Sequence, residues 1–173
     1  MKNFCGSTLF LDRSDINTDE IIPAKYLTEN TKEALKPHIL EDLHLHGFDP
    51  EKNIAGKNII VTRSNFGCGS SREHAVWVFE VNNINVVIAE SFARIFRQNM
   101  FNCGMLAIEL SKSDIDALFT FGTDTVISVD LEKNQITAQD GQVGKKIFSF
   151  ELNPFDRELV MAGGWLAYAD SKY

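Results

Sequence analysis

The sequence contains few cysteines, and they are widely spaced. Only three occur in 173 residues, Cys5, Cys68 and Cys103, with no CxxC pair and no histidine at zinc-finger spacing. An odd and dispersed set of thiols argues against a disulfide framework. It also argues against a zinc or iron–sulfur site held by this chain alone, because such sites need several ligands close together.

Histidines are scarce too, and three of the four fall in one polar connecting segment. Two acidic residues accompany them, so the group consists of His38, Glu41, Asp42, His44 and His46. Metal sites need ligands that converge in space, and proximity in sequence does not provide this. We interpret these residues as surface side chains and expect no metal site in this chain.

The sequence also lacks long apolar runs and an excess of positive charge. Lysine and arginine number 17 against 24 acidic residues, which gives a formal net charge of -7 and a pI near 5.1. Such a chain repels polyanions, so nucleic acid and anionic membranes are not expected as partners. No stretch reaches the ~18 apolar residues of a membrane span, and residues 1–20 contain no signal-peptide core. These features predict a cytoplasmic protein.

The rest of the composition is ordinary, with 44% hydrophobic and 24% charged residues. The length favours one globular domain over residues 1–173. Its middle alternates between strand and helix patterns: strand 58–62, helix 71–81, strand 86–89, helix 92–101 and strand 105–110. This order predicts an α/β fold with a partly parallel sheet and crossover helices.

The region before this middle has a weaker pattern. Residues 4–11 read as an opening strand, and residues 31–45 are helical but interrupted by Pro37. We therefore expect one broken helix or two short ones there. We expect residues 30–50 to be the most mobile helical and loop segment.

The region after it changes period. A helix over 112–119 is expected, with Ser113 or Asp114 as its cap. Strand patterns separated by hairpin-type turns then predict an antiparallel extension, over 125–130, 135–139 and 146–150. A last helix over 155–161 should follow, with Pro154 in its first turn and a Gly163–Gly164 pair at its end.

The segment GCGSSREH, from Gly67 to His74, connects a buried strand to an amphipathic helix. Free N–H groups at a helix start bind anions, and glycine lets a ligand approach the backbone. Arg72 adds a guanidinium suited to a carboxylate. Residue types alone therefore predict a small-anion site.

Two alternatives remain open for the same segment. Ser70 and Glu73 have capping-box spacing, so the serine could simply cap the helix. Such a cap stabilises a helix by about 1 kcal/mol. Cys68 could instead be an activated nucleophile, with Arg72 and His74 close in sequence.

Four segments in order resemble one known family. GCGSSREHA is similar to the swivel-domain signature of aconitases and isopropylmalate isomerases, and three more segments agree with it: DINTDEIIPAKYL at 15–27, VVIAESFARIF at 86–96 and NCGMLAIEL at 102–110. The chain resembles their detached small subunit. The resemblance implies an aconitase-type swivelling β/β/α three-layer domain. It also implies a large partner subunit, in a heterodimer or heterotetramer, which carries a 4Fe-4S cluster.

The resemblance also implies roles for individual residues. Ser70 would be the base that removes the proton next to a substrate carboxylate, and Arg72 would hold that carboxylate with groups of Gly69 and Ser71. Asp19 would organise acid chemistry at the departing water. A serine is a poor base unaided, so the site must be shielded from water by closure against the large subunit.

The loop after the entry segment bears on the substrate. Relatives that act on tricarboxylates have an arginine there, whereas this chain has Tyr26, Leu27, Thr28 and Glu29. The resemblance implies that Tyr26, Leu27 and Thr28 contact the substrate. The resemblance thus favours a hydro-lyase that interconverts 2- and 3-isopropylmalate by dehydration and rehydration in leucine biosynthesis. Dehydratases of 2,3-dimethylmalate, citramalate or methylmalate, or homoaconitate type are alternatives.

Departures from the family pattern are few. Val76 stands where many relatives have proline, and Gln98 departs from a more usual arginine arrangement and could alter the partner interface. We interpret Arg94, which matches the family, as a structural ion-pair or capping residue. Outside the family, a cysteine-dependent hydrolase and a non-catalytic carboxylate-binding module are the competing hypotheses.

Overall fold

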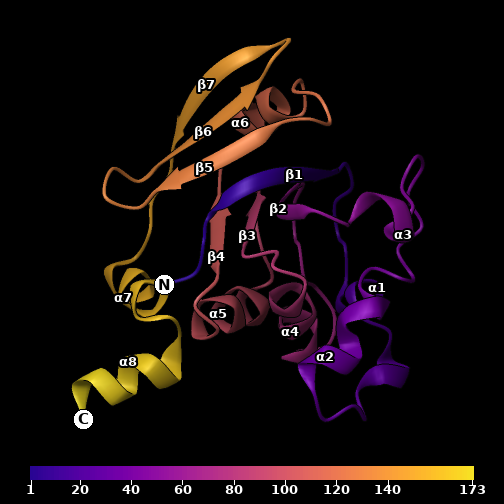
Figure 1. Cartoon of the computed structure of the whole chain (residues 1–173), viewed down its shortest axis with the longest axis vertical. Coiled ribbons are helices and arrows are strands. Elements are labelled where there is room, and N and C mark those ends of the chain that lie inside the picture. The colour runs from indigo at the N-terminus through magenta and orange to yellow at the C-terminus, as the bar shows by residue number, and fades with distance from the viewer.

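The computed structural model describes residues 1–173, and its centre is one curled seven-stranded sheet in the order β4-β3-β2-β1-β5-β6-β7 (Figure 1). The strands β1 to β4 pair in parallel, and β5 to β7 add an antiparallel extension. Their bounds are Cys5–Leu11, Lys57–Thr62, Val86–Ala89, Leu106–Glu109, Val126–Asp130, Gln135–Asp140 and Gly144–Ser149. The predicted α/β class and partly parallel sheet are confirmed.

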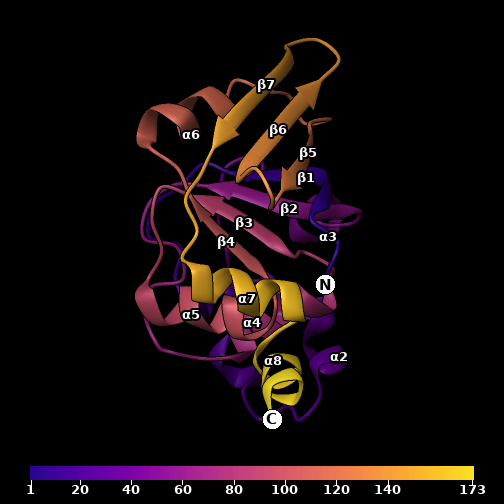
Figure 2. The same cartoon turned by 90° about the vertical axis from the view of Figure 1, so that its left-hand side faces the viewer.

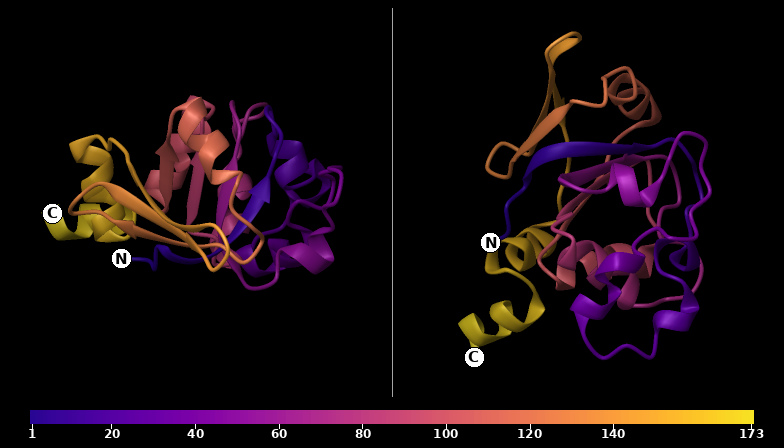
Figure 3. Two further views of the ribbon diagram at one scale, coloured as in Figure 1. Left: turned by 90° about the horizontal axis from the view of Figure 1, so that it is seen from above. Right: turned by 45° about the vertical axis from the view of Figure 1, so that its right-hand side comes forward.

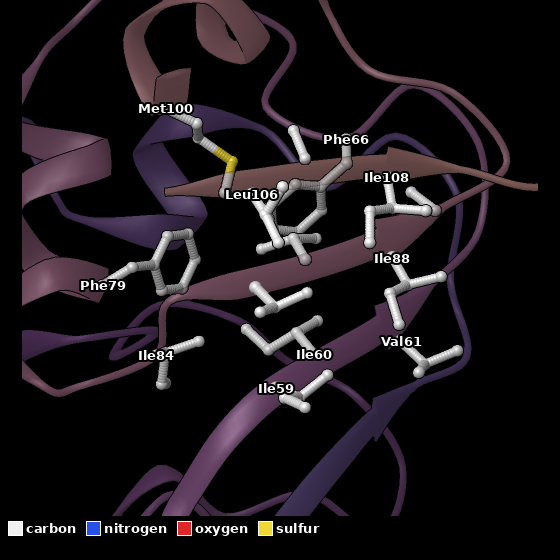
Figure 4. Close-up of a cluster of buried hydrophobic side chains, with 14 of the residues drawn as sticks. Ile59, Ile60, Val61, Phe66, Phe79, Ile84, Ile88, Met100, Leu106 and Ile108 are labelled. Carbon is white, nitrogen blue, oxygen red and sulfur yellow. The ribbon is translucent and has the colours of Figure 1, made fainter. Parts of the chain in front are cut away.

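The parallel strands are buried on both faces. Every residue of β3 is inaccessible, and α4 (His74–Val81) and α5 (Arg94–Asn102) cover one side of the sheet (Figures 1 and 2). Figure 4 shows Phe66, Phe79 and Met100 closing over the isoleucines and valines of the strands. Each such side chain stabilises the fold by roughly 1.5–3 kcal/mol. Strands buried on both faces explain the continuous apolar runs in the sequence.

The antiparallel strands curl over the opposite side and form a second β layer, which α6 (Lys112–Leu118) accompanies (Figures 1 and 2). The predicted cap of α6 was wrong. Ser111, with an extended backbone, accepts a hydrogen bond from the N–H of Asp114 at 3.2 Å. Asp114 lies in the first turn, where its charge favours the positive end of the helix.

The segment between β1 and β2 contains five short helices, namely α1 (Thr18–Ile21), η1 (Ala24–Tyr26), α2 (Lys32–Leu35), η2 (Lys36–His38) and α3 (Pro50–Asn53). Of these, α1, α2 and η2 pack against α4. The helical region 31–45 is divided at Pro37, as predicted: α2 ends at Leu35, and Pro37 lies inside η2. Leu35, Leu40 and Leu43 are buried, and they attach this region to the main core.

The chain ends in α7 (Pro154–Ala162) and α8 (Trp165–Lys172), on the edge opposite the short helices (Figure 3). Pro154 starts α7 and Gly163 caps its end, as predicted, but α8 was not expected. No helix of the chain combines the length and apolar character needed to cross a membrane.

Candidate functional site

Two connecting segments run side by side beyond the carboxyl ends of β1 and β2. The N–H of Gly67 donates to the carbonyl of Ile16 at 2.8 Å, and the N–H of Thr18 donates to the carbonyl of Cys68 at 2.9 Å. These bonds dock the entry segment onto the GCGSSREH loop. In open α/β sheets, ligands bind outside the carboxyl ends of parallel strands, where this loop lies.

A third segment, between β3 and α5, holds the loop from its other side. The N–H of Ala93 donates to the carbonyl of Phe66 at 2.9 Å. Gly67 has φ +80°, and a Cβ there would lie 2.2 Å from Cγ of Phe96, so only glycine allows this approach. The loop is therefore fixed against the start of α5.

The loop continues further than expected before its helix begins. We predicted a helix from residue 71, but α4 starts at His74, and residues 69–72 belong to the loop, in which Gly69 has φ +95°. Glu73 occupies the N-cap position without a side-chain cap. The hydroxyls of Ser70 and Ser71 are on exposed residues and form no hydrogen bond within the chain. The capping-box interpretation of Ser70 was therefore wrong.

Arg72 and Asp19 are brought together from the two docked segments. Arg72 Nη1 lies 2.5 Å from Asp19 Oδ1, with the Arg72 side chain 14% exposed and that of Asp19 61% exposed. Nη1 is buried and forms no aligned hydrogen bond, so this contact leaves its hydrogen-bonding capacity unused. The guanidinium of Arg72 is thus held by an exposed carboxylate and keeps hydrogen-bonding capacity of its own.

Asp19 is placed by a capping box that the sequence shows as N-x-x-E. Asn17 Oδ1 accepts from the N–H of Glu20 at 2.9 Å, and the N–H of Asn17 donates to Glu20 at 3.1 Å. Arg13 pairs with Glu20, and this hydrogen bond holds the pKa of that carboxyl below its usual value. Asp19 in the same turn is left free to point at Arg72.

These segments enclose a pocket of about 270 Å³. It is lined by residues 69–72, by Gly67 and Thr18, and by residues 93–96 at the start of α5. Four predicted site residues meet there: Gly69, Ser70, Ser71 and Arg72. Asp19 joins them through its contact with Arg72.

The other predicted contacts lie outside the pocket. Tyr26 stacks on His38 with ring centroids 3.8 Å apart, and its hydroxyl donates to Glu41 at 2.9 Å. Leu27 and Thr28 follow it and do not line the pocket of this chain. His38 Nδ1 lies 3.2 Å from Glu41, so this histidine takes part in a local surface cluster.

A larger groove of about 880 Å³ lies elsewhere, among α5, β4 and α7. It is lined by Glu109, Asp114, Glu151 and Asp156, with Arg97 as its one cationic residue. This predominantly acidic lining repels carboxylates. The smaller pocket is therefore the candidate site.

Cys68 does not have the surroundings of an activated thiol. Burial, and then the charge of Asp15, raise the pKa of the Cys68 thiol, whereas a nucleophilic cysteine needs a lowered pKa. The ring of His74 packs against Trp77, with centroids 4.7 Å apart. These contacts argue against the cysteine-dependent hydrolase.

The interpretation of Arg94 as an ion-pair or capping residue was wrong. Arg94 is the exposed first residue of α5, forms no ion pair or side-chain hydrogen bond, and lines the pocket. Thr18, with its buried hydroxyl at the same pocket, was also missed. Only its position in the chain could have indicated a site role for Arg94. It lies between β3 and the body of α5, just as the GCGSSREH loop lies between β2 and α4.

The two residues that depart from the family pattern, Val76 and Gln98, lie outside the pocket. Val76 is fully buried in α4, so it packs in the core. Gln98 is exposed on α5, and its side chain donates to Asn102 at 3.1 Å.

Comparison with known proteins identifies the family. The sequence profile of the aconitase C-terminal domain matches residues 5–113, more than half of the chain. The chain therefore belongs to the aconitase C-terminal domain family.

Its named relatives share a more particular description. The 3-isopropylmalate dehydratase small subunit 2 of Deinococcus radiodurans is 38% identical over 156 residues, which cover 90% of this chain and 71% of that one. The 3-isopropylmalate dehydratase small subunit of Deinococcus deserti is 39% identical, covering 90% and 81%. The crystal structure of 3-isopropylmalate dehydratase (leuD) from Methanocaldococcus jannaschii matches with a TM-score of 0.79 and 32% identity, over 98% of this chain and 94% of that one.

Proposed function

We propose that this chain is the small subunit of a 3-isopropylmalate dehydratase, a hydro-lyase that is active only with its large subunit. It would interconvert 2- and 3-isopropylmalate by dehydration and rehydration in leucine biosynthesis, in the cytoplasm. The observation that carries the proposal is the loop segment Gly69–Ser70–Ser71–Arg72. This segment precedes α4, does not cap that helix with a side chain, and presents free polar groups to the pocket. The similarity to small subunits of this name over 90% of the chain supports it.

Ser70 is the proposed base. Its hydroxyl is held by no partner in the chain, so it is available to take the proton from the carbon next to a carboxylate. Arg72 and the free start of α4 place positive charge beside it, which favours the deprotonated oxygen. Ser70 is exposed in this chain alone, so water must be excluded by the large subunit.

Arg72, Gly69 and Ser71 are proposed to hold that carboxylate. A guanidinium binds a carboxylate through paired N–H groups, and the buried Nη1 of Arg72 still has this capacity. Asp19 keeps the guanidinium in place and is exposed enough to reach the departing hydroxyl.

The 4Fe-4S cluster is proposed to belong to the large subunit. Nowhere in this chain do three or more histidine, cysteine or acidic side chains converge as metal ligands. When bound, such a cluster supplies a Lewis-acidic iron for the hydroxyl that leaves. The residues of this chain then position the diacid and accept its proton.

Substrate choice is proposed to depend on the loop of Tyr26, Leu27 and Thr28 after closure. It contains no arginine for a third carboxylate, and exposed Glu29 would repel one. An apolar branch is thus preferred, although a methyl difference changes binding by only about 1–3 kcal/mol. Residues 1–173 would act as one swivel domain, with 30–50 as the segment that moves on closure.

The test is anaerobic reconstitution with the large subunit, followed by the appearance of the unsaturated diacid from 2-isopropylmalate. Turnover by the complex and none by either subunit would support the proposal. Turnover of 2,3-dimethylmalate or citramalate in preference would replace the substrate. A complex that binds the diacid without turning over any of these acids would favour the carboxylate-binding module.

A further inference from the structure

Arg94 differs from every other arginine of the chain. The other five have partners: Arg13 pairs with Glu20, Arg63 with Asp12, Arg72 with Asp19 and Arg97 with Glu109, while Arg157 donates to the carbonyl of Leu131. Arg94 has no acidic partner and no hydrogen bond, although the chain carries 24 acidic residues. Its charge is therefore unused within this chain.

The backbone N–H groups at the start of α5 also lack hydrogen-bond partners. α5 has nine residues and begins after Ala93, which supplies no side-chain cap. The N–H groups of Arg94, Ile95 and Phe96 find no acceptor in the chain. Free N–H groups and the positive end of the helix dipole form an anion-binding position.

A buried hydroxyl at the pocket independently lacks a partner. Thr18 is 1% exposed, and its Oγ1 forms no hydrogen bond. This hydroxyl is directed toward Gly69, because a Cβ on Gly69 would lie 3.4 Å from it. Buried hydroxyls are nearly always paired, so the Thr18 hydroxyl is available to a polar ligand that enters the pocket.

We propose that Arg94 and the N–H groups at the start of α5 bind the second carboxylate of the diacid, opposite the carboxylate held by Arg72. This assignment rests on the proposed function for the identity of the diacid. Thr18 donates or accepts one further hydrogen bond in the same pocket. A diacid then spans the pocket from Arg72, in the loop before α4, to Arg94 at the start of α5, and its reactive carbon lies between them near Ser70.

The arrangement explains how a chain without an arginine after Tyr26 and Leu27 still neutralises two negative charges. One carboxylate meets Arg94 and the uncapped start of α5, and the other meets Arg72 beside the exposed Ser70 and Ser71. A monoacid would occupy only one of the two positions. This chain therefore recognises the two carboxylates of a diacid, while the large subunit contributes to recognition of the branched side group.

The test uses the reconstituted complex carrying Arg94→Gln, Arg94→Lys or the control Lys133→Gln, which removes one exposed charge from the β5–β6 turn. We expect Arg94→Gln to raise KM and the calorimetric Kd for 2-isopropylmalate at least tenfold, with a smaller effect on kcat. Arg94→Lys should restore part of the affinity, and Lys133→Gln should resemble the unaltered complex. The affinity for a branched monoacid should change less than threefold.

Two results would overturn the assignment. An unchanged Kd for the diacid in Arg94→Gln would show that Arg94 does not bind the diacid. A weaker association between the subunits, with diacid affinity per assembled complex unchanged, would make Arg94 a partner contact. Failure of the proposed function is distinguishable, because it appears as lost turnover in the unaltered complex, whereas calorimetry still compares diacid binding by the unaltered complex and by the Arg94→Gln complex.

Discussion

Two pairs of helices in this chain begin in opposite ways. α6 and α7 start with a side-chain cap, since Ser111 accepts from the N–H of Asp114 and Asn153 accepts from the N–H of Phe155 at 2.8 Å. α4 and α5, which start at the pocket, have no side-chain cap.

A side-chain cap at a helix start contributes to stability, whereas an uncapped helix start is available for ligand binding. A cap satisfies N–H groups permanently and stabilises a helix by about 0.5–2 kcal/mol. The two helices at the pocket lack this stabilisation, and at α5 the free N–H groups of the first turn face the ligand site. A serine therefore has different effects at the two places: Ser111 directly precedes α6 and caps it, whereas Ser70 lies four residues before the first residue of α4.

The largest effect is expected from Ser70→Ala in the reconstituted complex. Loss of the base should lower kcat by about 10²–10⁴-fold. Since Ser70 caps nothing, the free energy of unfolding should stay within about 0.5 kcal/mol of the original. Steady-state kinetics and urea unfolding measure the two quantities. Retained turnover would refute the base assignment, and a loss of stability with normal kcat would return Ser70 to a capping role.

Arg72→Gln should have the next largest effect. Losing a charged hydrogen-bonding partner costs about 1.5–3 kcal/mol, so KM should rise about tenfold to a hundredfold. Asp19→Asn is the matched control, because it breaks the same ion pair but leaves the guanidinium. Equal KM values in the two variants would show that the ion pair matters and that carboxylate binding by Arg72 does not.

Ala93→Asp would convert a pocket helix into a capped one. An aspartate at the N-cap of α5 should increase the free energy of unfolding by about 0.5–2 kcal/mol. It should also compete with the diacid for the same N–H groups and raise KM severalfold. Thermal unfolding and kinetics on one preparation test both. Greater stability with an unchanged KM would contradict ligand binding at this helix start.

Ser111→Ala should affect stability alone. Loss of the α6 cap should lower the free energy of unfolding by about 1 kcal/mol, while kcat and KM stay unchanged. Ser113→Ala, in the first turn of the same helix, serves as the control, because Ser113 does not cap α6. A similar loss in both variants would show that the cap is not the cause.

The smallest effect concerns the pH dependence of stability near α1. Arg13 lowers the pKa of Glu20 from its ordinary 4.5, so this carboxylate stabilises the fold above that pH and loses its contribution as pH falls through the folded value. Glu20→Gln should cost about 0.5–1 kcal/mol at pH 7, and the difference should shrink below about pH 4.5. Urea unfolding at pH 7 and pH 3.5 gives both values. A constant difference would assign the loss to the hydrogen bonds of Asn17 instead of to charge.

The strand pattern of the sequence predicted much of the fold, because burial on both faces leaves a clear apolar run. Residues 86–89 were predicted with the bounds that the structure has, and β1 and β2 differ by one residue. α8 was missed for the opposite reason: it buries no residue completely, so WLAYADSK shows no apolar face. The Gly163–Gly164 pair reads as an end of helical structure, and a second helix follows it directly.

The site was predictable in part. The glycines and Arg72 of GCGSSREH indicated an anion site, and residues 69–72 do line the pocket. The start of α4 could not be located, because Ser70 and Glu73 have the spacing of a capping box, whereas in the structure Glu73 is itself the N-cap residue. Arg94 was misinterpreted, since the lack of any partner is a property of three-dimensional arrangement.

The pocket borders segments near residues 17, 67 and 92, which are hydrogen-bonded to one another beyond the ends of the sheet. Contacts between residues so distant in sequence form slowly in folding, because long loops must close first. The binding site is thus completed together with the parallel pairing of β1, β2 and β3. A chain in which these strands have not yet paired therefore lacks the pocket.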